Sequence, residues 1–321
     1  MPPTAWQVLF FTPCRTARGK VSPAANGAIA IGTVVAGCPA FLRRGCAHGS
    51  PSGFRRILAA VQYRQVLRSC VVLAVLFCVA ARGAAPSYSA AGIVNSGNSA
   101  AGPFAPNSIL TIYGSDLARS SVGLTANDIS GGLLPTELNY TQVFVDNIAA
   151  PLFYVSDLQI NFLVPGGQST GDAKIRVASQ GISGPSVTVT VVAAAPALFF
   201  LAGGYAIATH VDNSLVSVDR PAHAGEIVVV YCTGLGKTDP NPASGELPRY
   251  AAQIVALSAL QVSLGGVAVT SGLIKYAGVT PGSAGLYQIN LEIPDNPGTD
   301  PELRVTIGGQ SSPAGLKLAI Q

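Results

Sequence analysis

The fold of this chain is decided by a repeated stretch: residues 159–165 read QINFLVP, and residues 288–294 read QINLEIP. A second pair precedes it, because residues 109–117 read ILTIYGSDL and residues 227–235 read IVVVYCTGL. The two pairs are offset by 129 and 118 residues, respectively. Similarity at two landmarks in the same order indicates two copies of one structural unit, the second about 11 residues longer between the landmarks.

Each repeated stretch has the two-residue period of a β-strand. In the first copy, Ile160, Phe162 and Val164 share one face, whereas Gln159 and Asn161 share the other, and the second copy repeats this order. The proline that follows each stretch removes a ladder donor and ends the strand. We therefore expect each copy to place its apolar face against a core.

Short β-branched runs continue along the chain and are separated by Gly, Pro, Asn and Asp. They predict strands at residues 109–113, 142–146, 159–164, 173–178, 186–192, 226–231, 260–264, 286–293, 303–307 and 316–320. The pairs Gly265-Gly266 and Gly308-Gly309 predict tight turns, because glycine accepts a positive φ. This spacing is typical of β-sandwiches, and we expect one module over residues 86–200 and another over residues 201–321.

Charge is unevenly distributed along the chain. All 15 acidic residues lie at or after Asp116, while ten of the 19 basic residues lie at or before Arg82. From residue 84 onward, nine basic residues face 15 acidic ones, a net charge of −6. A nucleic-acid partner is not expected, because phosphate binding needs a basic surface on the folded part.

The segment before the predicted modules has the order of a secretory signal. Two arginines, twelve apolar residues and a Gly-Ala-Ala exit follow one another between residues 64 and 85. Twelve residues are too few to cross a bilayer, which takes roughly 20. We expect a signal peptide at 63–85, a poorly structured or untranslated region at 1–62, and a mature chain without a membrane span that is secreted or extracytoplasmic.

Cysteine usage limits the chemistry of the predicted mature chain. Five of the six cysteines precede residue 84, so that Cys232 alone follows it. An internal disulfide and a cysteine-rich zinc site are then impossible. Cys232 is expected to be a small buried hydrophobe.

Several short motifs resemble catalytic or binding sites without the context that such sites need. Residues 167–171 read GQSTG, but a strand rather than a helix is predicted after them, so Ser169 is expected to be a loop residue. Residues 234–238 read GLGKT, but prolines follow where a phosphate loop needs a helix. His210, beside Asp212, and His223 lack companion ligands and are expected to make surface hydrogen bonds. We therefore expect no enzyme activity and no cofactor or metal.

The paired amides form one candidate ligand surface. Four amide side chains stand on the polar faces of the repeated strands, and tyrosines lie close to them in the sequence: Gln159, Asn161, Gln288, Asn290, Tyr154, Tyr276 and Tyr287. Amide groups beside aromatic rings suit sugars. In the alternative, the amides bond to the backbone of the preceding loop, because buried polar groups need partners.

The residues of the two landmarks resemble a known class of domains. Residues 108–117 and 143–165 resemble the IPT/TIG class of immunoglobulin-like domains, in which a Gly-x-x-Leu turn precedes a Gln-Ile strand ending in proline. Residues 93–321 are also similar to a C-terminal module family of secreted acidobacterial proteins, on the stretches APLFYVS at 150–156 and YCTGLG at 231–236. The resemblance implies an all-β chain of two tandem immunoglobulin-like sandwich modules and implies no activity.

These observations together predict a structural or adhesive module of the cell envelope or secreted matrix. Its partner is expected to be an extracellular protein or a polysaccharide, with binding placed on the loops that a sandwich presents at its ends. The alternative function is a carbohydrate-binding accessory domain.

Overall fold

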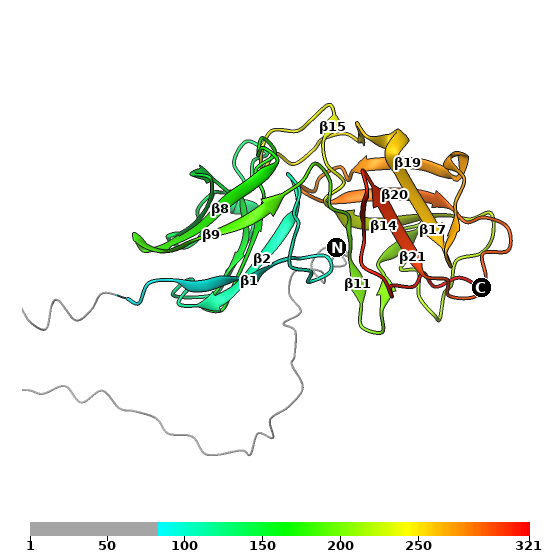
Figure 1. Ribbon diagram of the computed structural model, residues 1–321. Helices are drawn as coiled ribbons and strands as arrows, with labels where there is room; N and C mark the ends of the chain where they lie inside the picture. Colours follow the sequence, from blue (N-terminus) through cyan, green and yellow to red (C-terminus); the bar gives the residue numbers. More distant parts are fainter. Residues whose placement is uncertain (1–82) are drawn as a thin grey trace, which may run out of the picture. The chain divides into compact units, whose positions relative to one another are not determined.

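The computed structural model describes residues 83–321, all within one compact unit. The upstream region predicted at 1–62 and nearly all of the predicted signal peptide lie outside the described residues. The described part is almost entirely β, with three short 3-10 helices, and forms two tandem immunoglobulin-like sandwich modules (Figure 1). Within residues 83–321, no helix has the length and apolar character that a membrane span requires.

The first module consists of two antiparallel sheets, with strand orders β1-β2-β7-β6-β3 and β5-β4-β8-β9. Its elements are β1 (Ser87–Asn95), β2 (Ile109–Ser115), β3 (Val122–Gly123), η1 (Ala126–Asp128), β4 (Thr141–Val145), β5 (Ile148–Ala149), β6 (Leu152–Val155), β7 (Gln159–Leu163), β8 (Gly171–Ser179) and β9 (Ile182–Val191). Buried side chains from both sheets, such as Ile160 and Ile175, form one core. Alternate residues of each sheet therefore face inward, as the period of two predicted.

The second module has a larger sheet of order β10-β14-β20-β19-β16-β15, with β13 also on β14, and a smaller one of order β18-β17-β21-β22. β11 and β12 form a separate pair. The elements are β10 (Ala197–Leu198), β11 (Phe200–Leu201), β12 (Tyr205–Ala206), β13 (Ala208–His210), β14 (Ile227–Thr233), β15 (Thr238–Asp239), β16 (Ala252–Ile254), η2 (Leu257–Ala259), β17 (Leu260–Leu264), β18 (Val267–Ala268), η3 (Ser271–Leu273), β19 (Ile274–Val279), β20 (Tyr287–Glu292), β21 (Leu303–Ile307) and β22 (Gln310–Ser311). A second core joins its two main sheets.

The strand register confirms the repeat residue by residue. In the first module, β2 pairs with β7 so that Ile112 lies opposite Ile160. In the second, β14 pairs with β20 so that Val230 lies opposite Ile289. These partners are related by the same offsets of 118 and 129 residues that the sequence shows. The two modules therefore share the central strand pair of one architecture.

Most predicted strands and both predicted glycine turns are present. Gly265 and Gly266 connect β17 to β18, and Gly308 and Gly309 connect β21 to β22, all four with positive φ. Residues 316–320 do not form the predicted strand, because only isolated bridges at Lys317 and Ile320 occur there. Apolar alternation alone does not make a strand when no neighbouring strand offers a continuous ladder.

A loop of the second module packs against the central strands of the first. Ile109 and Leu163 are each 1% exposed yet belong to neither core. The Ile109 N–H donates to the Thr233 hydroxyl at 3.1 Å, and that hydroxyl donates to the Gly285 carbonyl at 2.8 Å. A Cβ at Gly285 would lie 2.3 Å from Leu163 Cδ1. The interface therefore depends on glycine at this position.

Candidate functional site

The amides and tyrosines predicted as a ligand surface are brought together in both modules. In the first, β6 pairs with β7 so that Tyr154 lies opposite Asn161. In the second, β19 pairs with β20 so that Tyr276 lies opposite Asn290. A register shift precedes each tyrosine. We name these sets the first strip (Tyr154, Gln159, Asn161) and the second strip (Tyr276, Gln288, Asn290).

The amides of each strip bond to one another. Gln159 Nε2 donates to Asn161 Oδ1 at 2.9 Å, and Gln288 Nε2 donates to Asn290 Oδ1 at the same distance. Residues two apart on a strand share a face, which places the two amides in reach. These side-chain bonds differ from the backbone partners that the alternative reading of the sequence predicted. In the first module, the preceding loop is held instead by the Ser156 hydroxyl, which accepts from the Gln159 N–H at 3.0 Å.

The strips differ in exposure. Asn161 is 5% exposed and also accepts the Thr111 hydroxyl at 3.1 Å, whereas Asn290 is partly exposed. Leu163, the next residue on the face of Asn161, is covered by the loop at Gly285. The expectation that Asn161 faces solvent is therefore wrong.

The tyrosines near the second strip have different environments. Tyr276 is partly exposed, and its hydroxyl lies 2.8 Å from the Val279 carbonyl and 3.0 Å from that of Ala252. Burial raises the pKa of Tyr276. Tyr287 is fully buried on the core face of β20, where its hydroxyl donates to the Gly236 carbonyl. Tyr287 therefore does not belong to the strip.

Three further residues singled out in the sequence lie outside the two strips. Ser169 lies in the loop before β8, as predicted, and a strand follows it. Cys232 is fully buried in the second core, and burial raises the pKa of its thiol. His223 lies in a loop, where its backbone N–H donates to the Glu226 carboxylate at 3.1 Å and its ring Nδ1 lies 3.1 Å from the Gln321 carbonyl. Cys232 therefore packs in the core and His223 makes hydrogen bonds in its loop, whereas Ser169 is an exposed loop residue.

His210 corrects the prediction of a surface histidine. It is 7% exposed, and its ring contacts the Glu226 carboxylate through Nδ1 and the Arg220 carbonyl through Nε2 at 3.2 Å. Asp212, expected beside it, instead pairs with the Arg220 guanidinium at 2.9 Å and with the Ser214 hydroxyl at 2.6 Å. Among residues 83–321, no three His, Cys, Asp or Glu side chains are grouped to hold a metal ion.

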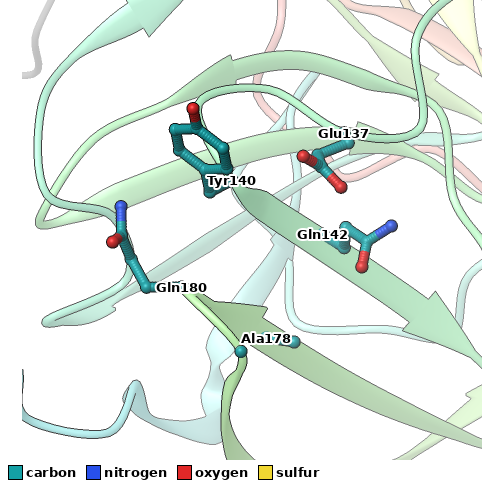
Figure 2. A pocket seen from close by; sticks show the side chains of 6 residues that line it. Glu137, Tyr140, Gln142, Ala178 and Gln180 are labelled. Atoms are coloured by element: carbon teal, nitrogen blue, oxygen red, sulfur yellow. The ribbon is translucent and has the colours of Figure 1, made fainter.

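A depression in the first module, lined mainly by polar residues, was not predicted from the sequence. It has a volume of about 330 Å³, and its lining comes from the turn before β4, from β4 and β8, and from the turn after β8. We name it the tyrosine pocket; it is lined by Glu137, Tyr140, Gln142, Ala178, Gln180 and Gly181. Figure 2 shows the Tyr140 ring projecting from its turn, with Gln180 on one side and Glu137 and Gln142 on the other.

The turn before β4 holds the tyrosine in an unusual backbone conformation. Asn139 and Tyr140 have φ of 49° and 57°, the left-handed region that a type I′ turn requires at both central positions. Asparagine tolerates this region, whereas a bulky aromatic residue there is uncommon. The Asn139 amide donates to the Ser120 hydroxyl at 2.8 Å. The tyrosine side chain is nevertheless 69% exposed.

The opposite wall is a second turn of the same kind. Gln180 and Gly181 connect β8 to β9 with φ of 54° and 76°. The Gln180 N–H donates to the Tyr140 carbonyl at 2.9 Å, which fixes one turn against the other. Gln142 stands on the outward face of β4, opposite Ala178 of β8. The small Ala178 side chain leaves room for the hollow between the two turns.

The second module supports the segment that leads into the pocket. The Leu134 N–H donates to the Gly245 carbonyl at 2.9 Å, and the Leu247 N–H donates to the Gly132 carbonyl at 2.8 Å. Glu137 lies three residues beyond Leu134. Sequence reasoning missed the pocket because its residues come from separate turns and strands and form no local motif. The one available signal was Gln180-Gly181, a turn dipeptide between two predicted strands.

Comparison with known families detects one domain. The family model described as IPT/TIG domain matches residues 93–191, the span over which the buried residues of the first core are found. This match agrees with the resemblance expected for the first copy. No curated protein matches the chain.

Several solved structures are similar over most of this chain. The surface glycan-binding protein PbSGBP-B from Prevotella bryantii is 13% identical, with 73% of this chain and 42% of that one covered and a TM-score of 0.23. SGBP-B of the Bacteroides ovatus mixed-linkage glucan utilization locus, in complex with a mixed-linkage heptasaccharide, is 12% identical, with 68% and 43% covered and a TM-score of 0.27. Domains 5–6 of the S-layer protein SbsC are 11% identical, with 73% and 98% covered and a TM-score of 0.23.

The chain spans less than half the length of the first two of these structures. With identities below 25% and TM-scores below 0.5, the similarities carry no argument about function.

Proposed function

We propose that this protein is a non-catalytic, extracytoplasmic interaction module that binds carbohydrate through the tyrosine pocket. The observation that carries the proposal is the conformation of Tyr140, whose ring is 69% exposed although its φ is 57°. A non-glycine residue in the left-handed region costs about 1–3 kcal/mol. The Tyr140 ring buries little surface in the folded protein, so packing offsets little of this strain. Contact between the exposed ring and a ligand explains the presence of tyrosine here better than a role in folding does.

The groups around the ring have the chemistry of sugar recognition. An aromatic ring offers a flat apolar face to the C–H groups of a sugar, and tyrosine loses little rotamer entropy on binding. Gln142 and Gln180 each supply amide donors and an acceptor, and Glu137 supplies carboxylate acceptors for hydroxyl groups. The pocket volume of about 330 Å³ lies at the lower end of the range for small-ligand sites.

The same lining supports binding without catalysis. Most glycoside hydrolases use two carboxyl groups that flank the scissile bond, about 5–9.5 Å apart. Glu137 is the single acidic side chain that lines the tyrosine pocket. Nothing in the lining supplies the second acid or base. We therefore propose recognition of the glycan rather than its cleavage.

An extracytoplasmic location belongs to the same proposal. It is supported by the order of charge, apolar run and small residues at 64–85. N-terminal sequencing of exported protein is expected to begin near residues 84–86. Recovery of residues 1–60 in the exported form would contradict the signal peptide and the location with it.

Binding to a glycan array, followed by isothermal titration, tests the proposed function. Tyr140→Ala is expected to abolish binding, because it removes the stacking face. Tyr250→Ala is the matched control, since Tyr250 is 81% exposed and does not line the pocket. If no glycan binds, or if Tyr140→Ala binds as the parent does, the proposed site is wrong.

The two strips define a second candidate, an adhesive role with a polysaccharide or an extracellular protein. It is favoured by the recurrence of one tyrosine–amide arrangement in both modules. The second strip is the better surface, because Gln288, Asn290 and Tyr276 are each partly exposed. Gln288→Ala with Asn290→Ala is expected to weaken binding only if this surface contributes. Unchanged binding would assign the strip to strand packing.

A further inference from the structure

A second depression lies on the same sheet as the tyrosine pocket. Its volume is about 300 Å³, and it is lined by Phe144, Asp146, Asn147, Lys174, Arg176 and Ser186. These residues come from β4 and its turn, from β8 and from β9. We name this depression the basic pocket, because two of its lining side chains are cationic.

The strand register places the two pockets on neighbouring rows of one sheet face. Gln142 lies opposite Ala178 in the tyrosine pocket, and Phe144 lies opposite Arg176 in the basic pocket. Rows two residues apart on a strand share a face and are separated by about 7 Å. The residue between them on β4, Val143, faces the core. The two pockets therefore adjoin on the outer face of β4 and β8.

The guanidinium of Arg176 is held in place but keeps several N–H donors that could bind a ligand. It lies 4.4 Å from the centre of the Phe144 ring, and its Nη1 donates to the Ser183 hydroxyl at 2.9 Å. A guanidinium has five N–H donors, and in the described part of the chain this is its one hydrogen bond. Neither Arg176 nor the exposed Lys174 is ion-paired among residues 83–321. The planar guanidinium of Arg176, with the ammonium group of Lys174 in the same pocket, is suited to bind a carboxylate.

The acidic groups of the face limit which anions fit. Asp146 lies in the basic pocket, but its carboxylate is already bonded by Gln168 Nε2 at 2.7 Å and by the Lys174 N–H at 2.8 Å. Two cations against this one anion leave the basic pocket positive. Glu137, in the tyrosine pocket, repels a second anion there. The two pockets therefore favour different groups: the tyrosine pocket favours a neutral, hydroxyl-rich sugar, and the basic pocket favours a carboxylate.

We infer that the face formed by β4 and β8 binds a linear polysaccharide in which a carboxylate-bearing sugar adjoins a neutral one, with the neutral sugar on Tyr140 and the carboxylate on Arg176 and Lys174. This inference rests on the proposed function and names its ligand class. From residue 174 to residue 180, β8 and its turn extend over about 20 Å, which accommodates several sugar rings.

Titration calorimetry with matched polymers tests the inference. Hyaluronan and unsulfated chondroitin, linear polymers in which glucuronate alternates with a neutral sugar, are each compared with the same polymer after reduction of its carboxylates to alcohols, together with neutral glucan. For the polymers that bind, the parent is expected to bind the acidic form about ten-fold more tightly than the reduced form. Raising the salt concentration should shrink this preference, because Lys174 is exposed and Arg176 is partly exposed.

Arg176→Gln is expected to remove the preference for the carboxylate while the reduced polymer still binds. Arg249→Gln is the matched control, because Arg249 is exposed and lines neither pocket. Since Arg176 also packs over Phe144, melting is followed for each variant. Lys174→Gln, on an exposed side chain, provides a second test without that packing contact.

The outcomes separate the inference from the proposed function. If no polymer binds, or if Tyr140→Ala leaves binding intact, the proposed function fails and takes the inference with it. If binding depends on Tyr140 but acidic and reduced polymers bind equally, the inference alone is overturned. The same holds if Arg176→Gln and Lys174→Gln both keep the full preference for the acidic form.

Discussion

Replacing Gly285 with alanine is expected to destabilise the protein by about 2–5 kcal/mol, in two parts. The first is backbone strain, because φ is 74° at this position and a left-handed residue other than glycine costs about 1–2 kcal/mol. The second is steric. The new Cβ would lie 2.3 Å from Leu163 Cδ1 and 2.9 Å from Ile109 Cγ1.

The steric part is large because the neighbours are confined. Carbon atoms in contact normally lie about 3.5–4.0 Å apart. Leu163 and Ile109 are each 1% exposed, and the backbone oxygen of Asn107 lies 3.1 Å from the same Cβ position. Overpacking of a filled interior costs about 1–3 kcal/mol. The alanine should therefore push the loop of the second module away from β2 and β7.

Gly282→Ala isolates the strain from the contact. Gly282 lies in the same loop with φ of 79°, and nothing lies within 4 Å of its Cβ position. Its variant should lose only the backbone part, about 1–2 kcal/mol. Urea denaturation, followed by circular dichroism in the far and near ultraviolet, measures the free energy of unfolding of both variants. Equal losses for Gly282→Ala and Gly285→Ala would refute the close packing between the modules.

Three further perturbations have definite expected outcomes. Ile160→Asp and Ile289→Asp should each unfold the module that contains it, because an unpaired buried charge costs several kcal/mol and the whole free energy of unfolding of a domain is about 5–15 kcal/mol. If both variants melted as the parent does, the burial of these strand faces would be contradicted. Tyr140→Gly should raise the melting temperature by relieving the left-handed strain while glycan binding is lost, and a lower melting temperature would show that the ring supports the fold. Hydrogen bonds from Ser214 hold the pKa of Asp212 in the folded protein below its unfolded value of about 3.9. The Asp212 carboxylate therefore stabilises the folded state above that pH, and this stabilisation is lost as the pH falls through the lower pKa of the folded state. Asp212→Asn should therefore melt below the parent at pH 6 and approach it at lower pH, and a gap that stays constant with pH would contradict this role.

The sequence predicted the site less completely than the strands. Alternation and turn residues are local, so the repeat, the core face of β7 and β20 and the two Gly-Gly turns could be read directly. That Tyr154 lies near the amides of β7 was expected from its place in the sequence, but its pairing with Asn161 was not predicted. The tyrosine pocket was not, because Tyr140 and Gln180 meet only through the hydrogen bond between two separate turns.

The exposure of the two repeated strands could likewise be predicted only in part from the sequence. β20 alternates between buried and partly exposed residues, as its sequence predicts, whereas β7 is buried on both faces over its last four residues. The two strands share the Gln-Ile-Asn start, and their environments differ because Gly285 of the second module covers Leu163. No local pattern in residues 159–165 encodes that cover.

The sequence by itself determined that residues 86–321 are all-β, that two copies of one sandwich follow each other, and which side chains of the central strands face each core. These properties depend on a period of two and on turn residues, both of which are short-range. Only the tertiary structure decided that Asn161 is buried, that His210 contacts Glu226, and that the outer face of β4 and β8 carries two adjoining pockets. Those properties depend on contacts between residues distant in the chain, whose register and packing no single segment specifies.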